Sequence, residues 1–105
     1  MRLSLVIALV AATAPAAAAV AGAHAYTIVI DKLKFGPVPS GLKAGDTIVW
    51  VNKDIFRHSV TARDGSFDID LQPKASGRLF VRRPGIVPFL CKFHPGMTGT
   101  LRISR

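Results

Sequence analysis

The nine residues FLCKFHPGM, at positions 89–97, contain three side chains that can bind a soft metal ion. Cys91, the only cysteine of the 105-residue chain, is followed by His94 and Met97 at intervals of three residues, and His58 lies upstream. Two imidazoles and a thiolate favour copper over hard cations, and a weak axial thioether completes the ligand set of blue-copper sites. The pattern therefore predicts a copper site formed by His58, Cys91, His94 and Met97.

Each of these residues also has an ordinary structural interpretation. A lone cysteine is often a small buried hydrophobe, and a methionine often fills gaps in a core. A single histidine such as His58 is more often a surface or core residue than a ligand. The combination favours metal binding, because the histidine and the methionine flank the only cysteine at short, regular spacing. A metal-bound thiolate is also protected from oxidation, which threatens a free thiol in an exported protein.

The N-terminal segment indicates export. In residues 1–25 a single charge, Arg2, precedes an uncharged run that ends in Ala23-His24-Ala25. Charged, apolar and small-x-small segments in this order are typical of a secretory signal peptide, so cleavage after Ala25 and a periplasmic location are expected. Ala-x-Ala also fits earlier positions. The alternative is a membrane anchor, since about 20 apolar residues can span a bilayer, but Pro15 and the alanine-rich composition argue against it.

Size and charge limit the remaining chain, residues 26–105, to one small basic domain. Without Arg2 it has 13 Lys and Arg against 6 Asp, a formal charge of +7, and it has no Glu. A domain of this size buries only about 60% of its unfolded surface, and one cysteine cannot form an internal disulfide. A bound metal would supply the missing stabilisation. The positive charge would also suit nucleic acid, but export argues against a nucleic-acid partner.

The hydrophobic pattern predicts strands and no significant helix. Alternating β-branched and aromatic runs occupy residues 26–31, 47–52, 58–62, 77–83, 86–91 and 98–104, and turn-forming residues separate them. Short strands at such spacing are typical of a small antiparallel β-sandwich or barrel. We expect Trp50 in the core. Pro88 has no N–H for a ladder, which predicts an edge or irregular strand there.

Two segments resemble a known family. IVPFLCKFHPGMTGTLRIS is similar to the copper loop and last strand of cupredoxins, the small blue copper proteins, and GLKAGDTIVWVNKDIFRHSVTA resembles their upstream half. The short Cys-x2-His-x2-Met loop is most similar to the amicyanins, because the related plastocyanins and pseudoazurins have a longer gap between His and Met. The resemblance implies a Greek-key sandwich that holds one copper ion, Cu(I) or Cu(II). His58, Cys91 and His94 would be the trigonal ligands and Met97 the axial one.

The resemblance also implies a function. Cupredoxins carry single electrons in the periplasm, and the edge of the C-terminal histidine is their usual electron port. The ligand set of this chain has no position for a substrate and no second metal cluster, so we expect that it is not an enzyme. The formal charge of +7 predicts an acidic redox partner, such as a cytochrome c, a dehydrogenase or a reductase, that docks over His94. We expect the protein to be a monomer. One alternative is a periplasmic copper carrier that transfers metal rather than electrons. Another is a fragment of a copper oxidase or nitrite reductase, against which the lack of further histidines argues.

Two departures from the family pattern lie beside the first histidine. Arg57 stands where proline is common, and Ser59 stands where Asn or Thr is frequent, although a hydroxyl can form a comparable bond across the loops. Sequence adjacency predicts an apolar surface around His94 made of Phe93, Pro95, Gly96 and Met97. It also predicts a ring of positive charge from Lys53, Arg57 and Lys92, whereas Lys74 lies well away in sequence and should matter less.

Overall fold

The structure is a computed structural model that describes residue 4 and residues 23–105. The segment expected to be a signal peptide, residues 1–25, therefore lies almost entirely outside the described residues. Within the described part, no helix is long and apolar enough to cross a membrane.

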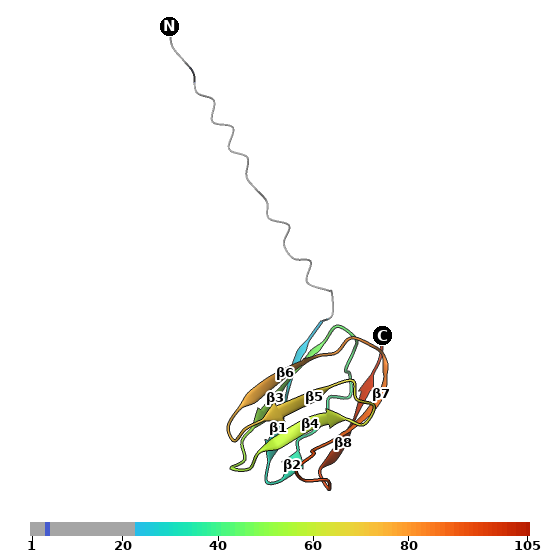
Figure 1. The fold of residues 1–105 in the computed structure, drawn as a ribbon. Helices are drawn as coiled ribbons and strands as arrows, with labels where there is room; N and C mark the ends of the chain where they lie inside the picture. The colour runs from blue at the N-terminus through green and yellow to red at the C-terminus, as the bar shows by residue number, and fades with distance from the viewer. Residues whose placement is uncertain (1–3, 5–22) are drawn as a thin grey trace.

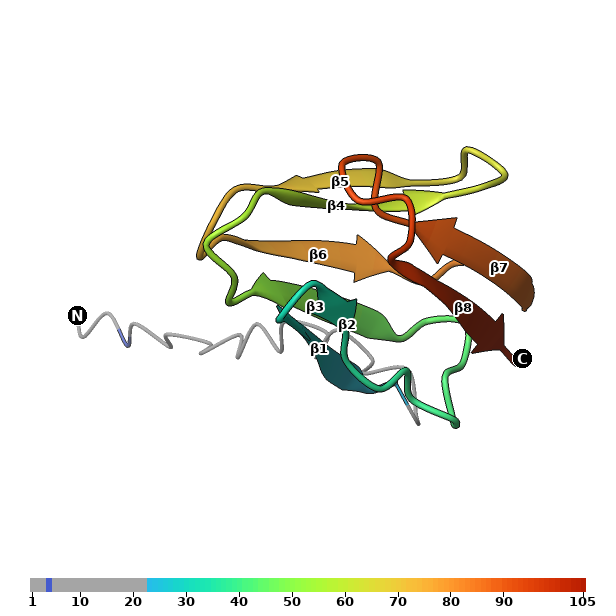
Figure 2. The same cartoon turned by 90° about the horizontal axis from the view of Figure 1, so that it is seen from below.

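Residues 23–105 fold into a sandwich of two four-stranded sheets (Figures 1 and 2). In chain order the strands are β1 (Ala25–Asp31), β2 (Lys34–Phe35), β3 (Thr47–Asn52), β4 (His58–Ala62), β5 (Asp68–Leu71), β6 (Ser76–Phe80), β7 (Gly85–Leu90) and β8 (Thr98–Ile103). One sheet has the order β2-β1-β3-β6 and the other β5-β4-β7-β8. The expected all-β sandwich is confirmed, and no helix interrupts the described strands.

The pairing is antiparallel with one exception. Strands β1 and β3 are parallel, in register from Ala25 opposite Thr47 to Ile30 opposite Asn52. Parallel neighbours need a crossover rather than a hairpin, and here the chain passes through β2 and a long loop before it returns as β3. Both strands therefore run toward the same end of the sandwich, where the loops that carry the predicted ligands also lie.

The sequence pattern missed two strands, β2 and β5. Strand β2 has only two residues, which is too short for any periodicity to register. Strand β5 has the sequence DIDL, in which Asp68 and Asp70 are exposed while Leu71 is buried. Exposed and more buried residues alternate along β5, as in an edge strand. The sequence pattern missed it because aspartate has a low strand propensity and two of its four residues are Asp.

Of the two alternatives expected at Pro88, the edge strand is wrong, because β7 lies between β4 and β8, and the irregular strand is confirmed. The structure accommodates the proline by shortening one ladder. Strand β4 pairs with β7 only at Leu90 and Phe89, so the pairing ends before position 88. The carbonyl of Pro88 still accepts a hydrogen bond of 2.9 Å from the N–H of Arg63.

Three aromatic rings form the centre of the core. Trp50 is fully buried, as expected, and meets Phe89 edge-to-face with the ring centroids 5.3 Å apart. Phe35 packs edge-on against both rings, 4.9 Å from Phe89 and 6.0 Å from Trp50. Such pairs stabilise a core by about 0.5–1.5 kcal/mol beyond the area that they bury. Gly99 on β8 makes room for Phe89, since a Cβ at position 99 would collide with that ring.

A buried carboxylate closes the end of the sandwich opposite the ligand loops. Asp46 is fully buried and accepts hydrogen bonds of 2.8 Å from the backbone N–H groups of His24 and Lys43. The bond from His24 and then the bond from Lys43 lower the pKa of the Asp46 carboxyl, although burial acts in the opposite direction. The carboxylate thus ties the start of β1 to the loop before β3.

This carboxylate predicts a loss of stability in acid. Because the folded-state pKa of Asp46 is depressed, its contribution is present above the unfolded pKa of about 3.9 and is lost as the pH falls through the folded value. In Asp46→Asn the free energy of unfolding should therefore be lower at neutral pH and fall less between about pH 5 and 2. Denaturant unfolding at several pH values measures both effects. Parallel pH profiles for the two proteins would contradict this role.

Candidate metal centre

The four residues predicted to bind metal lie at one end of the sandwich. His58 is the first residue of β4, Cys91 directly follows β7, and His94 and Met97 belong to the loop between β7 and β8. Antiparallel pairing of Thr61 with Leu90 sets the end of β7 beside β4. The two segments that the sequence separates are thereby brought together.

His58 and Cys91 are placed as two ligands of one ion would be. Both side chains are fully buried, and Nδ1 of His58 lies 3.7 Å from Sγ of Cys91. Two donors on one tetrahedral ion, with metal–sulfur and metal–nitrogen bonds of about 2.3 and 2.1 Å, would be about 3.6 Å apart. The observed separation therefore fits the sulfur and nitrogen donors of a soft metal ion.

The other two residues lie close to this pair. The His94 ring centroid is 4.9 Å from that of His58, and the ring is partly exposed, whereas Met97 is 6% exposed. Backbone bonds close the loop, because Met97 N–H donates to the carbonyl of His94 over 2.8 Å and Cys91 N–H donates to that of Met97 over 3.1 Å. Within the described residues, no three His, Cys, Asp or Glu side chains form a closed metal cluster.

Ser59 joins the two ligand segments. Its backbone N–H donates to Cys91 Sγ over 3.3 Å, and its hydroxyl accepts a bond of 2.8 Å from the N–H of Lys92. The bond across the loops that the sequence suggested is therefore present. The first bond gives the buried Cys91 sulfur a hydrogen-bond partner on β4 and holds it beside His58.

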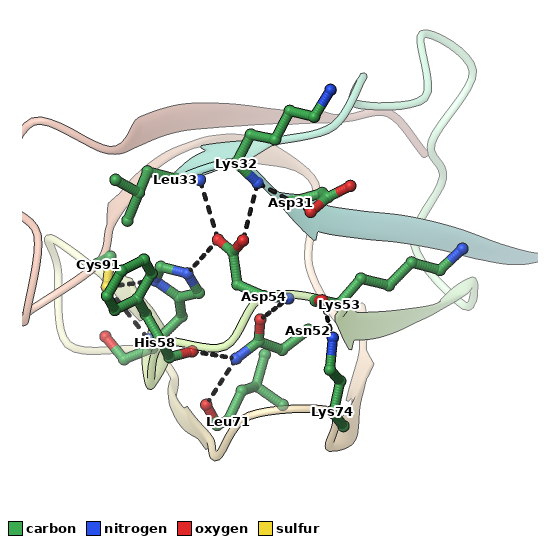
Figure 3. Close-up of polar contacts among 12 residues, drawn as sticks. Asp31, Lys32, Leu33, Asn52, Lys53, Asp54, His58, Leu71, Lys74 and Cys91 are labelled. Carbon is green, nitrogen blue, oxygen red and sulfur yellow. Dashed lines mark hydrogen bonds and ion pairs between the residues drawn. The ribbon is translucent and has the colours of Figure 1, made fainter.

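Asp54 holds the far side of the His58 ring, and sequence reasoning missed it. Its Oδ2 lies 2.8 Å from Nε2 of His58 (Figure 3). Burial would raise the pKa of the Asp54 carboxyl, but hydrogen bonds from Leu33 N–H, from His58 and from Lys32 N–H outweigh it and the pKa is lowered. A carboxylate at this distance can accept a hydrogen bond from Nε2–H of His58, while Nδ1 faces Cys91.

Asn52, the last residue of β3, supports Asp54 and was also missed. Its Oδ1 accepts the backbone N–H of Asp54 over 2.9 Å, while its amide donates to the carbonyls of Phe56 and Leu71 over 2.8 and 3.1 Å. Residues 52–54, Asn-Lys-Asp, read simply as a turn in the sequence. The available signal was that Asp54 precedes His58 by four residues, but the chain must fold back for the two side chains to meet.

The apolar surface around His94 is made of partly different residues from those that the sequence suggested. Phe93 is 41% exposed as expected, but Met97 is buried and does not belong to this surface. Phe56 replaces it, being 45% exposed with its ring 5.9 Å from that of His94. Ile55, the preceding residue, is also exposed. We call Ile55, Phe56, Phe93 and Pro95 the apolar apron of His94.

Arg57 and Lys92 do not form the expected ring of free positive charge, because each is paired with an aspartate of β5. Arg57 forms an ion pair with Asp70 and lies over the Phe93 ring, 4.4 Å from its centroid. Lys92 Nζ is 2.7 Å from Asp68. These cations lower the pKa of both aspartates. The edge strand that the sequence pattern missed therefore neutralises the charge beside the apron.

Lys74 is not remote from the site. Its Nζ donates to the carbonyl of Lys53 over 2.5 Å, because the β5–β6 turn and the β3–β4 loop lie at the same end of the sandwich. Lys74 is therefore a poor control for charge changes near His94, although it is distant in sequence. Arg82, which follows β6 at the opposite end, is remote instead.

Comparisons with known proteins identify the family. The model of the cupredoxin-like domain matches residues 3–103. Amicyanin from Paracoccus versutus is 29% identical over 96 residues, which cover 86% of this chain and 73% of that protein. The structure of a copper(I) form of an amicyanin mutant has a TM-score of 0.65 and 23% identity, over 76% of this chain and 82% of that one.

The same fold occurs within a larger protein. A copper-containing nitrite reductase from Thermus scotoductus is 24% identical with a TM-score of 0.66, and the match covers 76% of this chain but only 22% of the reductase. Because the family model spans nearly the whole sequence, this chain belongs to the cupredoxin-like family, and its fold is the one found in amicyanin.

Proposed function

We propose that the protein is a periplasmic blue copper protein that carries single electrons between redox partners. The observation that carries this proposal is the buried pair of His58 and Cys91, whose Nδ1 and Sγ atoms are 3.7 Å apart. Family membership and the resemblance to a copper(I) amicyanin support copper as the single cofactor. In the proposed site His58, Cys91, His94 and Met97 bind the metal, which supplies a Cu(I)/Cu(II) couple.

The residues around the site would keep its geometry nearly constant during electron transfer. His58 and Cys91 are closed off from water and fixed by hydrogen bonds from neighbouring segments. The loop that carries the other two ligands is closed by its own backbone bonds. A donor set held in this way has little freedom to rearrange when the charge on the metal changes.

The apolar apron suits a transient redox partner. His94 is the only one of the four proposed ligands that is partly exposed, and the exposed Phe56 packs against its ring. Ile55 and Phe93, which adjoin these two residues in the chain, are also exposed. Such patches on small soluble proteins mark interaction sites. We propose that an acidic cytochrome c, dehydrogenase or reductase docks here on a monomer. The similarity to nitrite reductase covers 22% of that enzyme and concerns the fold alone, so we do not propose catalysis.

Copper carriage is the second candidate function, since the same donors could deliver metal. The burial of the site argues against it, because a protein that delivers metal must expose that metal for transfer, whereas Cys91 and His58 are both fully buried. Isotopic exchange of bound copper during repeated oxidation and reduction would distinguish electron transfer from copper delivery. An electron-transfer protein should retain its copper through many cycles, whereas a protein that delivers copper should lose it to a competing chelator.

Copper loading should produce a blue protein. Addition of Cu(II) to the exported chain should give a thiolate-to-copper charge-transfer band in the red region, and Cys91→Ser should abolish that band by removing the thiolate. Visible absorption measures this directly. Met97→Gln is the matched control, because a weak axial ligand is not needed for the band; it should keep the colour and lower the reduction potential. A colourless wild-type protein with a titratable thiol would contradict the site.

The ion pairs at β5 lead to a prediction about electron-transfer rates. Asp68→Asn should release the charge of Lys92 and increase the rate with an acidic cytochrome at low salt, by up to about tenfold. Lys92→Glu should decrease it. Both effects should vanish near 1 M salt, where the screening length is about 3 Å. Stopped-flow mixing at several ionic strengths measures these rates.

Arg82→Glu is the control for charge, since it makes the same change as Lys92→Glu at the opposite end of the sandwich. It should slow electron transfer less. If the two variants slow the reaction equally, total charge rather than the apron would determine the encounter.

The position of His24 bears on export. Its backbone N–H donates to Asp46 and its carbonyl accepts the N–H of Thr47 over 2.9 Å, so His24 extends the ladder of β1. Cleavage after Ala25 would remove both bonds. We propose cleavage two residues earlier, at the Ala-Gly-Ala sequence of residues 21–23, which would leave the α-ammonium of His24 beside the Asp46 carboxylate.

Intact mass measurement of the exported protein checks this proposal, with the expected chain beginning at His24. A chain that begins at Tyr26 would overturn it. As a matched comparison, residues 26–105 produced directly should melt at a lower temperature than residues 24–105, since only the longer chain retains the two bonds of His24.

A further inference from the structure

The turn between β1 and β2 has an unusual backbone. Lys32 and Leu33 are consecutive residues with positive φ, 52° and 60°. Two-residue hairpins of this kind normally contain Asn and Gly, because other residues are strained in the left-handed region. Strained residues persist only where the surrounding structure holds them, and they cluster at functional sites. Here the turn lies at the same end of the sandwich as His58.

One carboxylate holds both residues of the turn. Asp54 Oδ1 accepts the N–H of Lys32 and Oδ2 accepts the N–H of Leu33, each over 2.9 Å (Figure 3). The same Oδ2 lies 2.8 Å from Nε2 of His58. Asp54 is only 8% exposed, so these contacts replace water around most of the charged group.

The contacts fix the carboxylate from three directions. The two N–H groups of the turn set the plane of the Asp54 carboxylate, and Nε2 of His58 lies beside its Oδ2. Asn52 Oδ1 accepts the backbone N–H of Asp54 over 2.9 Å and so fixes the main chain that carries the carboxylate. A carboxylate held in this way cannot rotate without breaking a bond to the turn. The orientation of the His58 ring therefore depends on a hairpin that is distant in sequence.

We propose that the Lys32–Leu33 turn and Asp54 form an outer part of the metal centre that positions His58. Asp54 fixes the His58 tautomer with the proton on Nε2, and the turn fixes Asp54, so that Nδ1 faces Cys91 before any metal binds. Asp54 is a positioning residue and does not touch the metal. The inference rests on the proposed function only in treating His58 as a ligand.

The first test uses the metal-free protein and therefore does not depend on copper or on electron transfer. Nitrogen-15 NMR of the imidazoles should show His58 in a single Nε2–H tautomer whose proton exchanges slowly with water. In Asp54→Ala that proton should exchange at least tenfold faster and both tautomers should be populated. Asp46→Asn is the matched control, because it also disturbs a buried carboxylate that accepts two backbone N–H groups. It should leave His58 unchanged.

A second variant separates positioning from folding. Replacing Lys32 and Leu33 by Asn and Gly gives a turn that adopts the left-handed conformation without help from a carboxylate. If Asp54→Ala alone fails to fold, the combination with Asn-Gly should fold, and His58 should still exchange rapidly between tautomers. With copper bound, this combined variant should show a shifted reduction potential and a shifted charge-transfer band relative to the Asn-Gly variant alone.

The outcomes distinguish this inference from the proposed function. An unchanged His58 tautomer and exchange rate in the combined variant would overturn it, even if the wild-type protein is blue. Full recovery of the wild-type potential by the Asn-Gly turn in the absence of Asp54 would overturn it as well, because the carboxylate would then only stabilise the hairpin. A wild-type protein that binds no copper would refute the proposed function, while the metal-free NMR result would still show whether Asp54 positions His58.

Discussion

The contact of Ser59 with the segment after β7 is the interaction on which the candidate site depends. Strands β4 and β7 pair over only two residues, so the sheet alone does not fix the loop beyond Leu90. Two hydrogen bonds continue the connection past the end of the ladder. The N–H of Ser59 donates to Cys91 Sγ, and the N–H of Lys92 donates to the Ser59 hydroxyl. Since His58 directly precedes Ser59, the same contact sets the imidazole and the sulfur side by side.

The sequence was sufficient for the features that depend on side-chain type and spacing. The alternation in TIVWVN and TGTLRIS predicted two strands, and the interval between Cys91, His94 and Met97 predicted a shared loop. The resemblance to cupredoxins even suggested the bond made by Ser59. These predictions succeeded because periodicity reports which face of a strand is buried, and because residues within one tight loop must remain close to one another.

Asp54 and Asn52 could not be predicted in the same way, since their partners are backbone groups of distant segments. Nothing in the letters of residues 52–54 distinguishes a solvated turn from one whose side chains bond to Lys32, Leu33 and Leu71. The positive φ of the β1–β2 turn was equally hidden, because neither Lys nor Leu favours it. Such contacts can be identified only when the fold shows which distant segments lie next to each other.

Composition likewise predicted the net charge but not its distribution. Arg57 and Lys92 looked free because each is flanked by apolar or uncharged residues, whereas in the fold they face Asp70 and Asp68 across the sheet. Exposed pairs of this kind contribute little to stability, about 0–1 kcal/mol. Their effect is on the charge beside His94, because each of these cations is paired with an aspartate of β5. An apolar apron bordered by neutralised pairs favours brief contact with a partner over tight binding.

Two buried aspartates show how a small domain without Glu meets its need for acceptors. Short strands leave backbone N–H groups unpaired where the chain enters, turns or crosses over, and each such group is costly when buried. Asp46 accepts two of them at one end of the sandwich and Asp54 two at the other. Aspartate suits both positions, because its short side chain loses less rotamer freedom than glutamate when it is fixed. Asp54 differs from Asp46 in that its second oxygen also reaches a histidine. The same kind of contact that ties β1 to the loop before β3 at one end of the sandwich therefore orients a proposed metal ligand at the other.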